Sequence, residues 1–330
     1  MLAAGMINTA MAMGPNHVDV AGTGFAVLDR VYSKREKTFE ALGGSCGNVL
    51  VSLAMLQRSV FPLLALGDDA VGNSLVDEFI RAGADTRYIS RRFGMLSPVL
   101  AQWLDADAGQ HSFSFVCPET EEDLPRYCSV DEYEVEGAKS ALSACAVFYT
   151  DRLSHSTFAA MQTAAAGGSV IFFEPSAIDD DELFDRAIAL CSIVKYSSDR
   201  LSDRLSERKL RAGAIAVVTH GADGLEVTQN GDRAWCSAIK APVVRDTCGS
   251  GDMVSVGIID WMLTHHGRGT QQPSLSDFLP GVVAGQRLAA INCAFAGARG
   301  IFLHHGASCA RSVLDGRIAE VAIQLDLFGF

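Results

Sequence analysis

Short apolar runs that alternate with helical patterns constrain the fold of this chain more than any other feature of its sequence. Strand-like apolar runs occupy residues 18–28, 61–66, 146–149, 170–173, 193–196 and 215–219. Between them lie helical patterns at 48–56, 73–82, 154–166, 181–190 and 199–212. Short buried strands in alternation with helices are typical of a parallel sheet that helices cover on both faces. The sequence therefore predicts an α/β fold with a mostly parallel sheet.

Two segments interrupt this alternation. Residues 32–40 are polar and extended in character, and residues 99–116 alternate apolar and polar side chains around a turn at 105–109. The second pattern is typical of a β-hairpin with one face in water. We expect both segments to form a small β-layer that projects from the main sheet. The stretch 263–280 is interpreted as a surface loop between two helices.

The composition is that of a globular protein, with 48% hydrophobic and 20% charged residues among 330. A net charge of −12 argues against general affinity for nucleic acid or an anionic membrane. It does not exclude a nucleotide ligand, because backbone N–H groups can form a local phosphate site. Nine cysteines without C-x-x-C pairs predict free thiols in a reducing compartment. We expect a cytoplasmic protein with a disordered leader at 1–17, a single domain at 18–330 and no membrane-spanning segment.

The segment Asp246-Thr-Cys-Gly-Ser-Gly-Asp252 is followed at once by an apolar helical pattern. A Gly-Ser-Gly turn that opens a buried helix places backbone N–H groups at the positive end of the helix dipole, where phosphate oxygens bind. An acid at the same helix N-terminus repels an anion, but it is useful if its carboxylate takes a proton from a nucleophilic hydroxyl. The alternative is that Asp252 only caps the helix and the glycines only serve the turn.

A second glycine-rich turn, Gly43-Gly-Ser-Cys-Gly-Asn48, also enters a buried helix. Its glycines would let a small substrate approach the backbone, and Asp29 and Asn48 would hydrogen-bond the hydroxyls of that substrate. We place Asp29 at the end of the first predicted strand, where α/β sheets expose side chains to a ligand. A tight strand-to-helix turn capped by Asn48 explains the same pattern equally well.

Two further turns follow predicted strands. Thr219-His-Gly221-Ala-Asp-Gly224 comes directly after the run IAVVT, and a glycine-rich turn at such a place suits nucleotide phosphates. The stretch 67–72 (GDDAVG) follows another predicted strand, and its two acids are expected to cap the next helix.

In order and spacing, these motifs resemble the ribokinase (PfkB) carbohydrate kinase family over nearly the whole chain. A di-glycine followed by Asn matches at 43–48, and G-D-D-x-x-G matches at 67–72. The family's G-V-D element reads Gly-Ala-Asp at 83–85. The T-x-G-x-x-G turn matches at 219–224, and D-T-x-G-A-G-D matches at 246–252 with serine in place of alanine.

The resemblance implies a Rossmann-like ribokinase fold in which helices cover both faces of a mostly parallel sheet. A small β-sheet lid would be built from about 30–42 and 97–117 and would exclude water on closing. The implied activity is ATP-dependent transfer of the γ-phosphoryl group to a hydroxyl of a small neutral sugar or nucleoside.

The resemblance also implies roles for individual residues. Asp252 would be the catalytic base, and the N–H groups of Gly249, Ser250 and Gly251 would form the anion hole. The acceptor would be held by Asp29, Gly43, Gly44 and Asn48. ATP would be bound by Thr219, Gly221, Gly224 and Asn292.

Two family motifs are altered in this chain. The N-x-x-E motif, which is associated with Mg²⁺ and phosphate positioning, has Ser197 at the Asn and Arg200 at the Glu. The D-x-N-x-R segment reads Glu174-Pro-Ser-Ala-Ile, which keeps an acid but loses the Asn and the Arg. Arg200 could supply positive charge directly, or Asp199 could replace the missing carboxylate. Glu174 and Asp199 are therefore the candidate metal ligands.

ATP and Mg²⁺ are the cofactors that the resemblance implies, and it leaves open a monovalent cation such as K⁺. The implied partners are ATP and a small sugar or nucleoside, with neither nucleic acid nor membrane. A homodimer through the lid is left open.

Three other functions fit the sequence less well than a kinase. The alternative is a catalytically weak or inactive kinase-fold sensor of a sugar or nucleotide, which the altered motifs favour and the intact Asp252 opposes. A dinucleotide-binding oxidoreductase is disfavoured because G-x-G-x-x-G fails at Val27. A Walker-type NTPase is excluded by the lack of G-x-x-x-x-G-K-[ST].

Overall fold

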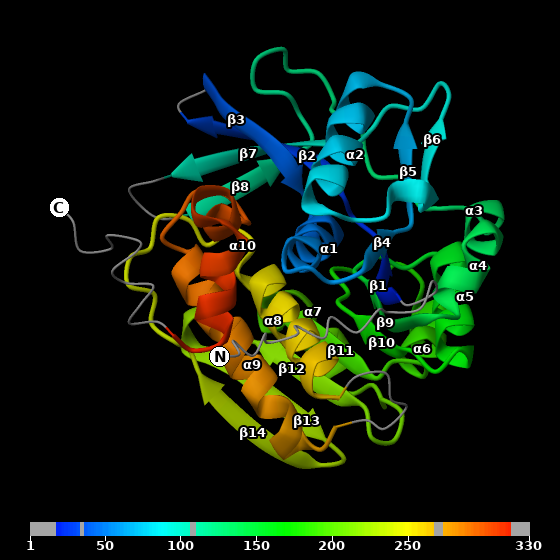
Figure 1. Cartoon of the computed structure of the whole chain (residues 1–330), viewed down its shortest axis with the longest axis vertical. Helices are drawn as coiled ribbons and strands as arrows, with labels where there is room; N and C mark the ends of the chain where they lie inside the picture. The colour runs from blue at the N-terminus through cyan, green and yellow to red at the C-terminus, as the bar shows by residue number, and fades with distance from the viewer. Residues whose placement is uncertain (1–17, 34–35, 106–109, 267–272, 318–330) are drawn as a thin grey trace, which may run out of the picture.

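The computed structural model describes residues 18–33, 36–105, 110–266 and 273–317, so the leader predicted at 1–17 lies outside the described residues. Within these ranges the centre is an eight-stranded sheet with the order β14-β13-β12-β11-β10-β9-β1-β4 (Figure 1). Neighbours from β12 to β4 pair in parallel, whereas β13 and β14 extend the edge in antiparallel fashion. This confirms the predicted mostly parallel sheet. Its strands are β1 (Val18–Thr23), β4 (Val60–Pro62), β9 (Cys145–Thr150), β10 (Val170–Phe173), β11 (Ile193–Ser197), β12 (Ile215–Thr219), β13 (Gly224–Gln229) and β14 (Asp232–Ser237).

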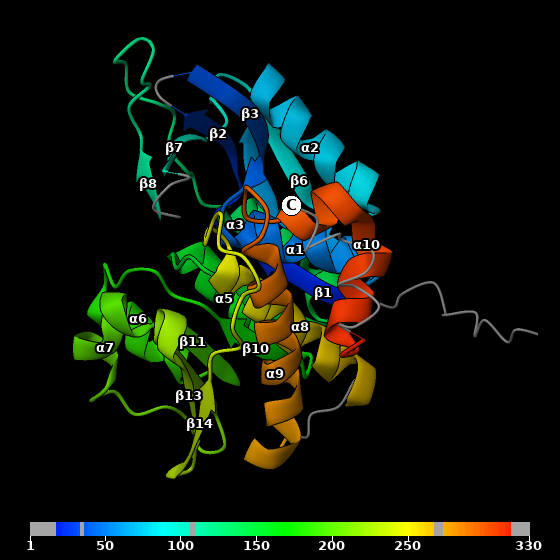
Figure 2. The same ribbon diagram turned by 90° about the vertical axis from the view of Figure 1, so that its left-hand side faces the viewer.

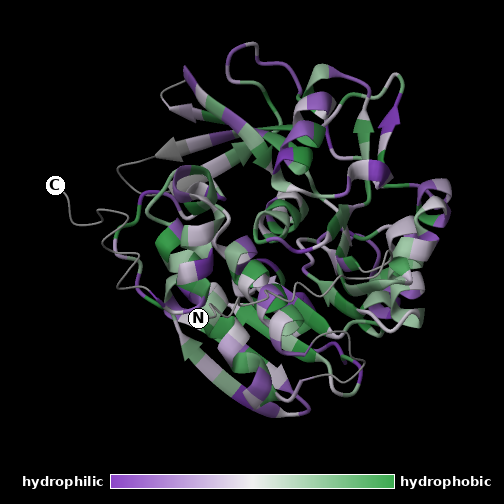
Figure 3. Ribbon diagram, in the orientation of Figure 1, coloured by the Kyte–Doolittle hydropathy of each residue, from purple (hydrophilic) through white to green (hydrophobic). Residues whose placement is uncertain are grey.

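Helices cover both faces of this sheet because its strands are apolar on both sides (Figure 3). Val20 and Phe172 pack in the core beneath α1, α8 and α9, whereas the next residues, Ala21 and Phe173, pack beneath α5 and α6. Successive side chains of a strand point to opposite faces, so a strand buried on both sides is apolar throughout. The helices are α1 (Ser45–Met55), α2 (Ala70–Ala82), α3 (Glu132–Gly137), α4 (Lys139–Leu142), α5 (His155–Ala166), α6 (Asp181–Ile188), α7 (Ser198–Leu205), α8 (Ser250–His265), α9 (Leu275–Asn292) and α10 (Gly300–Leu314), with 3₁₀ turns η1 (Thr86–Tyr88) and η2 (Gly221–Asp223). Across the described ranges, no helix combines the length and the apolar character that crossing a lipid bilayer requires.

A second sheet, called the lid sheet below, stands beside the central one (Figure 2). In its order β3-β2-β7-β8, the adjacent strands β7 and β8 form the predicted antiparallel hairpin, whose tip at 106–109 lies outside the described residues. Strand β2 pairs with β3 in antiparallel and with β7 in parallel fashion. The predicted small β-layer is therefore present. Its strands are β2 (Val27–Ser33), β3 (Glu36–Gly43), β7 (Val99–Asp105) and β8 (Gln110–Ser114).

The prediction of one strand over 18–28 is wrong. The chain leaves the central sheet after β1 and enters the lid sheet at Val27. The bend occurs at Gly24, whose φ is +146° and whose Cβ, if it had one, would lie 1.9 Å from Asp151 Oδ1. Asp29 consequently lies within β2 of the lid sheet, and not at the end of a strand of the central sheet as predicted.

Two other predicted boundaries are also wrong. The run 61–66 is divided at Leu63, whose N–H donates to Gly22 O at 2.8 Å, and only its first part, in β4, belongs to the central sheet. The stretch 263–280 is not a loop throughout, because α8 continues to His265 and α9 begins at Leu275.

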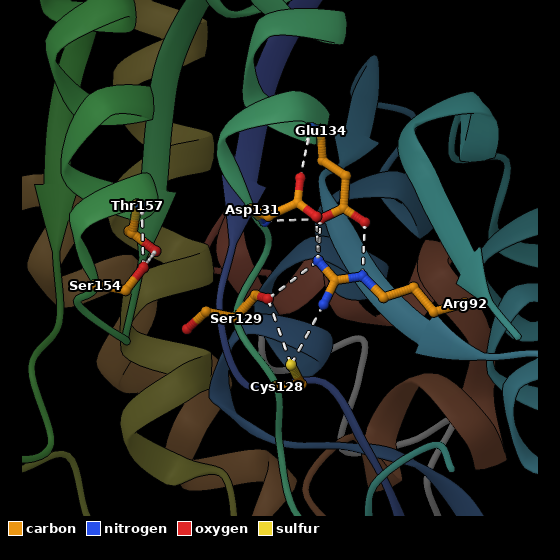
Figure 4. A network of polar contacts seen from close by, with 7 residues as sticks. All are labelled: Arg92, Cys128, Ser129, Asp131, Glu134, Ser154 and Thr157. Atoms are coloured by element: carbon orange, nitrogen blue, oxygen red, sulfur yellow. Dashed lines mark hydrogen bonds and ion pairs between the residues drawn. The ribbon is translucent and has the colours of Figure 1, made fainter. Parts of the chain in front are cut away.

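The strand pair β5 (Leu64–Gly67) and β6 (Ile89–Arg92) is joined to α3 through Arg92 (Figure 4). The Arg92 guanidinium donates to Glu134 Oε1 at 3.0 Å and to Asp131 Oδ2 at 3.2 Å, and its Nη1 lies 3.4 Å from Cys128 Sγ. Asp131 and Glu134 also form a capping box at the start of α3. One arginine thus fixes the end of β6 and the first turn of α3 together.

Candidate active site

The first turns of α1 and α8 meet in one polar contact. Asn48 Nδ2 donates a 2.8 Å hydrogen bond to Asp252 Oδ2. Ser45, the first residue of α1, also acts to lower the pKa of Asp252. The predicted base and the predicted acceptor-side Asn are thereby brought together, although 204 positions separate them.

Asp252 is buried, with 7% of its surface exposed. Burial, and next the negative charge of Glu174, raise its pKa to about 6, while the hydrogen bond from Asn48 and the charge of Lys195 oppose this rise. A carboxylate with a raised pKa is a stronger base than an ordinary aspartate and is still ionised at neutral pH. Asp252 therefore has the protonation behaviour that a general base requires.

Bare backbone N–H groups lie at the start of α8. Gly249 adopts a left-handed conformation with φ of +70°, and a Cβ there would lie 2.5 Å from Ala298 Cβ. Within the described residues, no hydrogen-bond acceptor is found for the N–H groups of Gly249 and Gly251, whereas the N–H of Ser250 donates to Thr247 O at 3.2 Å. Two of the three N–H groups predicted for the anion hole are therefore free to bind a ligand at the positive end of a 16-residue helix.

Two buried oxygen atoms lie on the predicted acceptor side. The Asp29 side chain passes over Gly43 so closely that a Cβ at Gly43 would lie 1.8 Å from Asp29 Oδ2. The neighbouring Gly44, with φ of +77°, is the residue just before α1. Oδ1 of Asp29 and Oδ1 of Asn48 are buried and have no hydrogen-bond partner in the part of the chain that the structure describes. Because buried polar atoms nearly always have partners, these two acceptors are available to ligand hydroxyls.

The end of β3 is held by two charged residues that together form a clamp. Arg299, which is 3% exposed, donates to Leu42 O at 2.6 Å and to Glu78 Oε2 at 2.9 Å. The other oxygen of Glu78 accepts from Leu42 N at 2.6 Å. Burial raises the pKa of the adjacent Asp29 to about 7, although the charge of Arg299 opposes the rise. The clamp fixes the backbone just before the acceptor-side glycines.

The predicted nucleotide turn follows β12 at the same sheet edge as Ser197, because Thr219 and Ser197 are partners in the β11–β12 pairing. Gly221 and Gly224 have φ of +57° and +132°, conformations that favour glycine. Open space surrounds the Cα of Gly221, where a Cβ would have no neighbour within 4 Å. This openness leaves room for a ligand beside the turn.

Asn292, the fourth residue predicted to bind ATP, is fully buried at the end of α9. Its Nδ2 donates to Ala298 O at 3.1 Å, and its Oδ1 accepts from Ile301 N at 3.1 Å. The amide therefore holds together the turn between α9 and α10.

Sequence reasoning missed Lys195, which lies within β11 and is 2% exposed. Its ammonium forms a hydrogen-bonded ion pair with Glu174, at the end of β10. The other Glu174 oxygen accepts from Tyr149 Oη at 3.0 Å and from Ser255 Oγ at 2.5 Å. A lone lysine inside an apolar strand was the signal that could have revealed it, because lysine is almost never buried without a partner.

The candidate metal ligands are separated. Glu174 is engaged by the three side chains just described, whereas Asp199 is exposed in the first turn of α7, next to the exposed Arg200. Among the described residues, no group of three or more His, Cys, Asp or Glu side chains is arranged to hold a metal ion. These residues thus form no preformed Mg²⁺ cage, and Mg²⁺ often binds proteins through few carboxylates and through substrate phosphates.

Two further polar residues near the acceptor side lie outside every recognised motif. Gln102 of β7 is 1% exposed, and its Nε2 has no partner within the described ranges. Arg152 Nη1 donates to Asp151 Oδ2 at 3.0 Å and to Ser176 Oγ at 2.7 Å, and its guanidinium lies over the ring of Phe25. The pairing of β2 with β7 and the bend at Gly24 bring Gln102 and Arg152 to the acceptor side, so only the tertiary structure reveals these two residues.

Comparison with known proteins agrees with this geometry. The sequence model of the pfkB family carbohydrate kinases matches residues 26–294. A fructokinase of Vibrio alginolyticus is 24% identical over 262 residues, which cover 74% of this chain and 83% of the relative. Two solved structures share the fold. The fructokinase of Xylella fastidiosa with bound ATP has a TM-score of 0.72 and 20% identity, and the match covers 91% of this chain and 98% of that chain. The aminoimidazole riboside kinase of Salmonella enterica, complexed with aminoimidazole riboside and an ATP analogue, has a TM-score of 0.70 and 19% identity, and the match covers 90% of this chain and 99% of that chain. From the family match over most of its length, we conclude that this chain belongs to the pfkB family of carbohydrate kinases.

Proposed function

We propose that this protein transfers the γ-phosphoryl group of ATP to a hydroxyl of a small neutral sugar or nucleoside, with Asp252 as the base. The observation that carries the proposal is the buried Asp252 carboxylate, hydrogen-bonded by Asn48, at the same helix start as the bare N–H groups of Gly249 and Gly251. An acid that only capped the helix would need neither burial nor a second helix to orient it. General base catalysis explains both.

The reaction follows from these positions. The free oxygens of Asp29 and Asn48 accept hydrogen bonds from acceptor hydroxyls, which orients the reacting hydroxyl toward Asp252. Its proton passes to the Asp252 carboxylate as its oxygen bonds to the γ-phosphorus. The bond from that phosphorus to the bridging oxygen breaks, and ADP leaves. Negative charge on the phosphoryl oxygens is stabilised by the N–H groups of Gly249 and Gly251.

Charge on the acceptor side favours a neutral acceptor. The two arginines nearby have carboxylate partners of their own, since Arg152 pairs with Asp151 and Arg299 with Glu78. Asp29 and Asp252 add further acid, so the site carries surplus negative charge that would repel a phosphorylated or acidic sugar. The names of the similar proteins, fructokinase and aminoimidazole riboside kinase, support a sugar or riboside as the acceptor class.

An acceptor panel tests the proposal. Unphosphorylated sugars and nucleosides, sugar phosphates and sugar acids are each assayed for ADP release with ATP. We expect a neutral compound to have the highest kcat/KM. A sugar phosphate or acid at the head of the panel would overturn the neutral-acceptor proposal, while ATP-dependent transfer would stand.

We expect transfer to require Mg²⁺, because moving a γ-phosphoryl group needs its charge neutralised. Ser197 and Arg200 replace the Asn and Glu of the family motif that is associated with this ion. The double change Ser197→Asn with Arg200→Glu should lower the Mg²⁺ concentration that gives half-maximal rate. An unchanged concentration would mean that this element does not handle the metal in this chain.

The second candidate function is a sensor that binds ATP or a sugar without turnover, and the altered Ser197/Arg200 element favours it. Calorimetric titration with a non-hydrolysable ATP analogue, run beside the turnover assay, separates the two. Analogue binding without ADP release for any acceptor would establish the sensor and overturn the kinase.

A further inference from the structure

We propose that Lys195 is a catalytic residue of this kinase: its ammonium binds the phosphoryl group during transfer, and Glu174 holds the ammonium in place. The inference rests on the proposed function and adds a residue to it. Nothing in the family motifs recognised above points to this position, which lies inside a strand of the central sheet.

The burial of Lys195 needs an explanation. Its neighbour Ile193 packs in the core on the α8 side of the sheet, and residues two apart in a strand share a face, so Lys195 also points toward α8. An ammonium in that setting loses most of its hydration, which is costly unless hydrogen bonds and an opposite charge replace it. A leucine or valine would serve the sheet at no such cost. The lysine is therefore better explained by a ligand.

The surroundings of Glu174 identify it as a support for the lysine. One carboxylate oxygen pairs with Lys195, and the other accepts from Tyr149 of β9 and Ser255 of α8. Both oxygens are thus engaged by side chains from three different elements. A carboxylate held in this way fixes its partner in one position, as supporting groups do around other reactive side chains.

The Lys195 ammonium lies beside the anion hole. A Cβ built on Gly251 would lie 3.6 Å from Lys195 Nζ and 3.8 Å from Glu174 Oε1, so the ion pair borders the space next to the Gly251 backbone. An ammonium has three N–H donors. Within the described residues, Glu174 is its only hydrogen-bond partner, which leaves donors for a ligand at the Gly251 backbone.

This arrangement suits phosphoryl transfer. The charge on the oxygens of the migrating group is best met by cations and dipoles that are already in position, and in a buried site such groups act strongly. Lysine is a common point-charge ligand of phosphate. The D-x-N-x-R segment of this chain has lost its Arg, and Lys195 supplies a fixed positive charge at the same sheet edge.

The test is the variant Lys195→Met, which keeps an unbranched side chain one atom shorter and removes the charge. Its kcat should fall by about 100-fold, the loss typical of one transition-state donor. Its affinity for the ATP analogue AMP-PNP should weaken by about tenfold or more relative to its affinity for ADP, because only the analogue carries a γ-phosphoryl group. The control is Lys209→Met, which removes an exposed lysine and should change neither value.

A second variant keeps the test decisive if Lys195→Met unfolds because Glu174 is left unpaired. The double change Glu174→Gln with Lys195→Met removes both charges, and replacing both members of a buried pair is often tolerated. We expect the double variant to fold and to keep the loss of kcat. If the double variant recovers activity together with stability, the pair is only structural and the inference is overturned. The inference is also overturned if Lys195→Met weakens the binding of AMP-PNP and of ADP equally.

Turnover of the unsubstituted protein separates failure of the inference about Lys195 from failure of the proposed function. If it phosphorylates an acceptor but is insensitive to Lys195→Met, only the inference about Lys195 fails. If it turns over no acceptor at all, the proposed function itself fails.

Discussion

The side-chain amide of Asn48 joins the two halves of the candidate site through its 2.8 Å hydrogen bond to Asp252. The bond uses the nitrogen of the amide and leaves Oδ1, which has no partner among the described residues, for a ligand. One side chain therefore orients the base and presents an acceptor to the substrate. Since an amide donor favours the ionised form of a carboxylate, Asn48 also limits how far burial raises the pKa of Asp252.

Asp252→Asn should abolish most turnover while ATP and acceptor still bind. Asparagine keeps an oxygen that can accept from Asn48, but it cannot take a proton, so kcat should fall by about 10²–10⁴-fold. Steady-state kinetics and calorimetric titration measure the two effects, with Asp203→Asn on the exposed face of α7 as control. A loss below tenfold would show that Asp252 is not the base.

The rate should depend on pH in the weakly acidic range. Burial raises the pKa of Asp252 to about 6 and that of Asp29 to about 7. A base acts in its deprotonated form, so kcat/KM should be constant above about pH 8 and should fall as the pH drops through these values. Circular dichroism over the same range controls for unfolding. A rate that stays constant down to pH 4.5 contradicts an essential carboxylate with a raised pKa.

The two glycines at the start of α8 should respond differently to alanine. At Gly249, positive φ and the 2.5 Å approach to Ala298 mean that Gly249→Ala should lower the melting temperature. At Gly251 a methyl group has room in the protein, because its nearest neighbour would be Lys195 Nζ at 3.6 Å. Gly251→Ala should therefore fold normally and bind ATP poorly. Thermal melts and titration with AMP-PNP measure this contrast, and normal nucleotide binding by Gly251→Ala would contradict the anion hole.

Asp29→Asn should stabilise the protein at alkaline pH while it weakens acceptor binding. The folded state holds the Asp29 proton more tightly than the unfolded chain, since burial raises the pKa from 3.8 to about 7. Its contribution to stability is therefore lost as the pH rises through about 7. A gain of about 1 kcal/mol at pH 8 would raise Tm by roughly 1–2 °C.

Calorimetric melts at pH 5.5 and pH 8 test this expectation. The difference in Tm between the variant and the unsubstituted protein should be larger at pH 8. Asp232→Asn, at an exposed position of β14, is the control. An equal difference at both pH values would mean that Asp29 is ionised throughout.

Local motifs were sufficient to predict some of the site. The glycine turn before Asp252 and the turn before Asn48 each carry their conformational requirement in a few adjacent residues, and both begin helices as expected. The position of Asp29 could not be predicted, because the bend at Gly24 depends on Asp151, which is distant in sequence. Lys195 was missed because strand prediction weighs average hydropathy, in which one charged residue counts for little.

The clamp of Arg299 and Glu78 on Leu42 has a mechanical consequence. It fixes β3 at the end where the strand meets α1, so the lid sheet is held firmly at that end. When a sheet that is held at one end bends, the displacement of its residues grows with their distance from that end. Asp29 is paired with Ala41, next to the held end, whereas Ser33 is paired with Glu36 at the far end of the same ladder. Bending of the lid sheet would therefore displace Ser33 and Glu36 more than Asp29, which would keep nearly the same distance from Asp252.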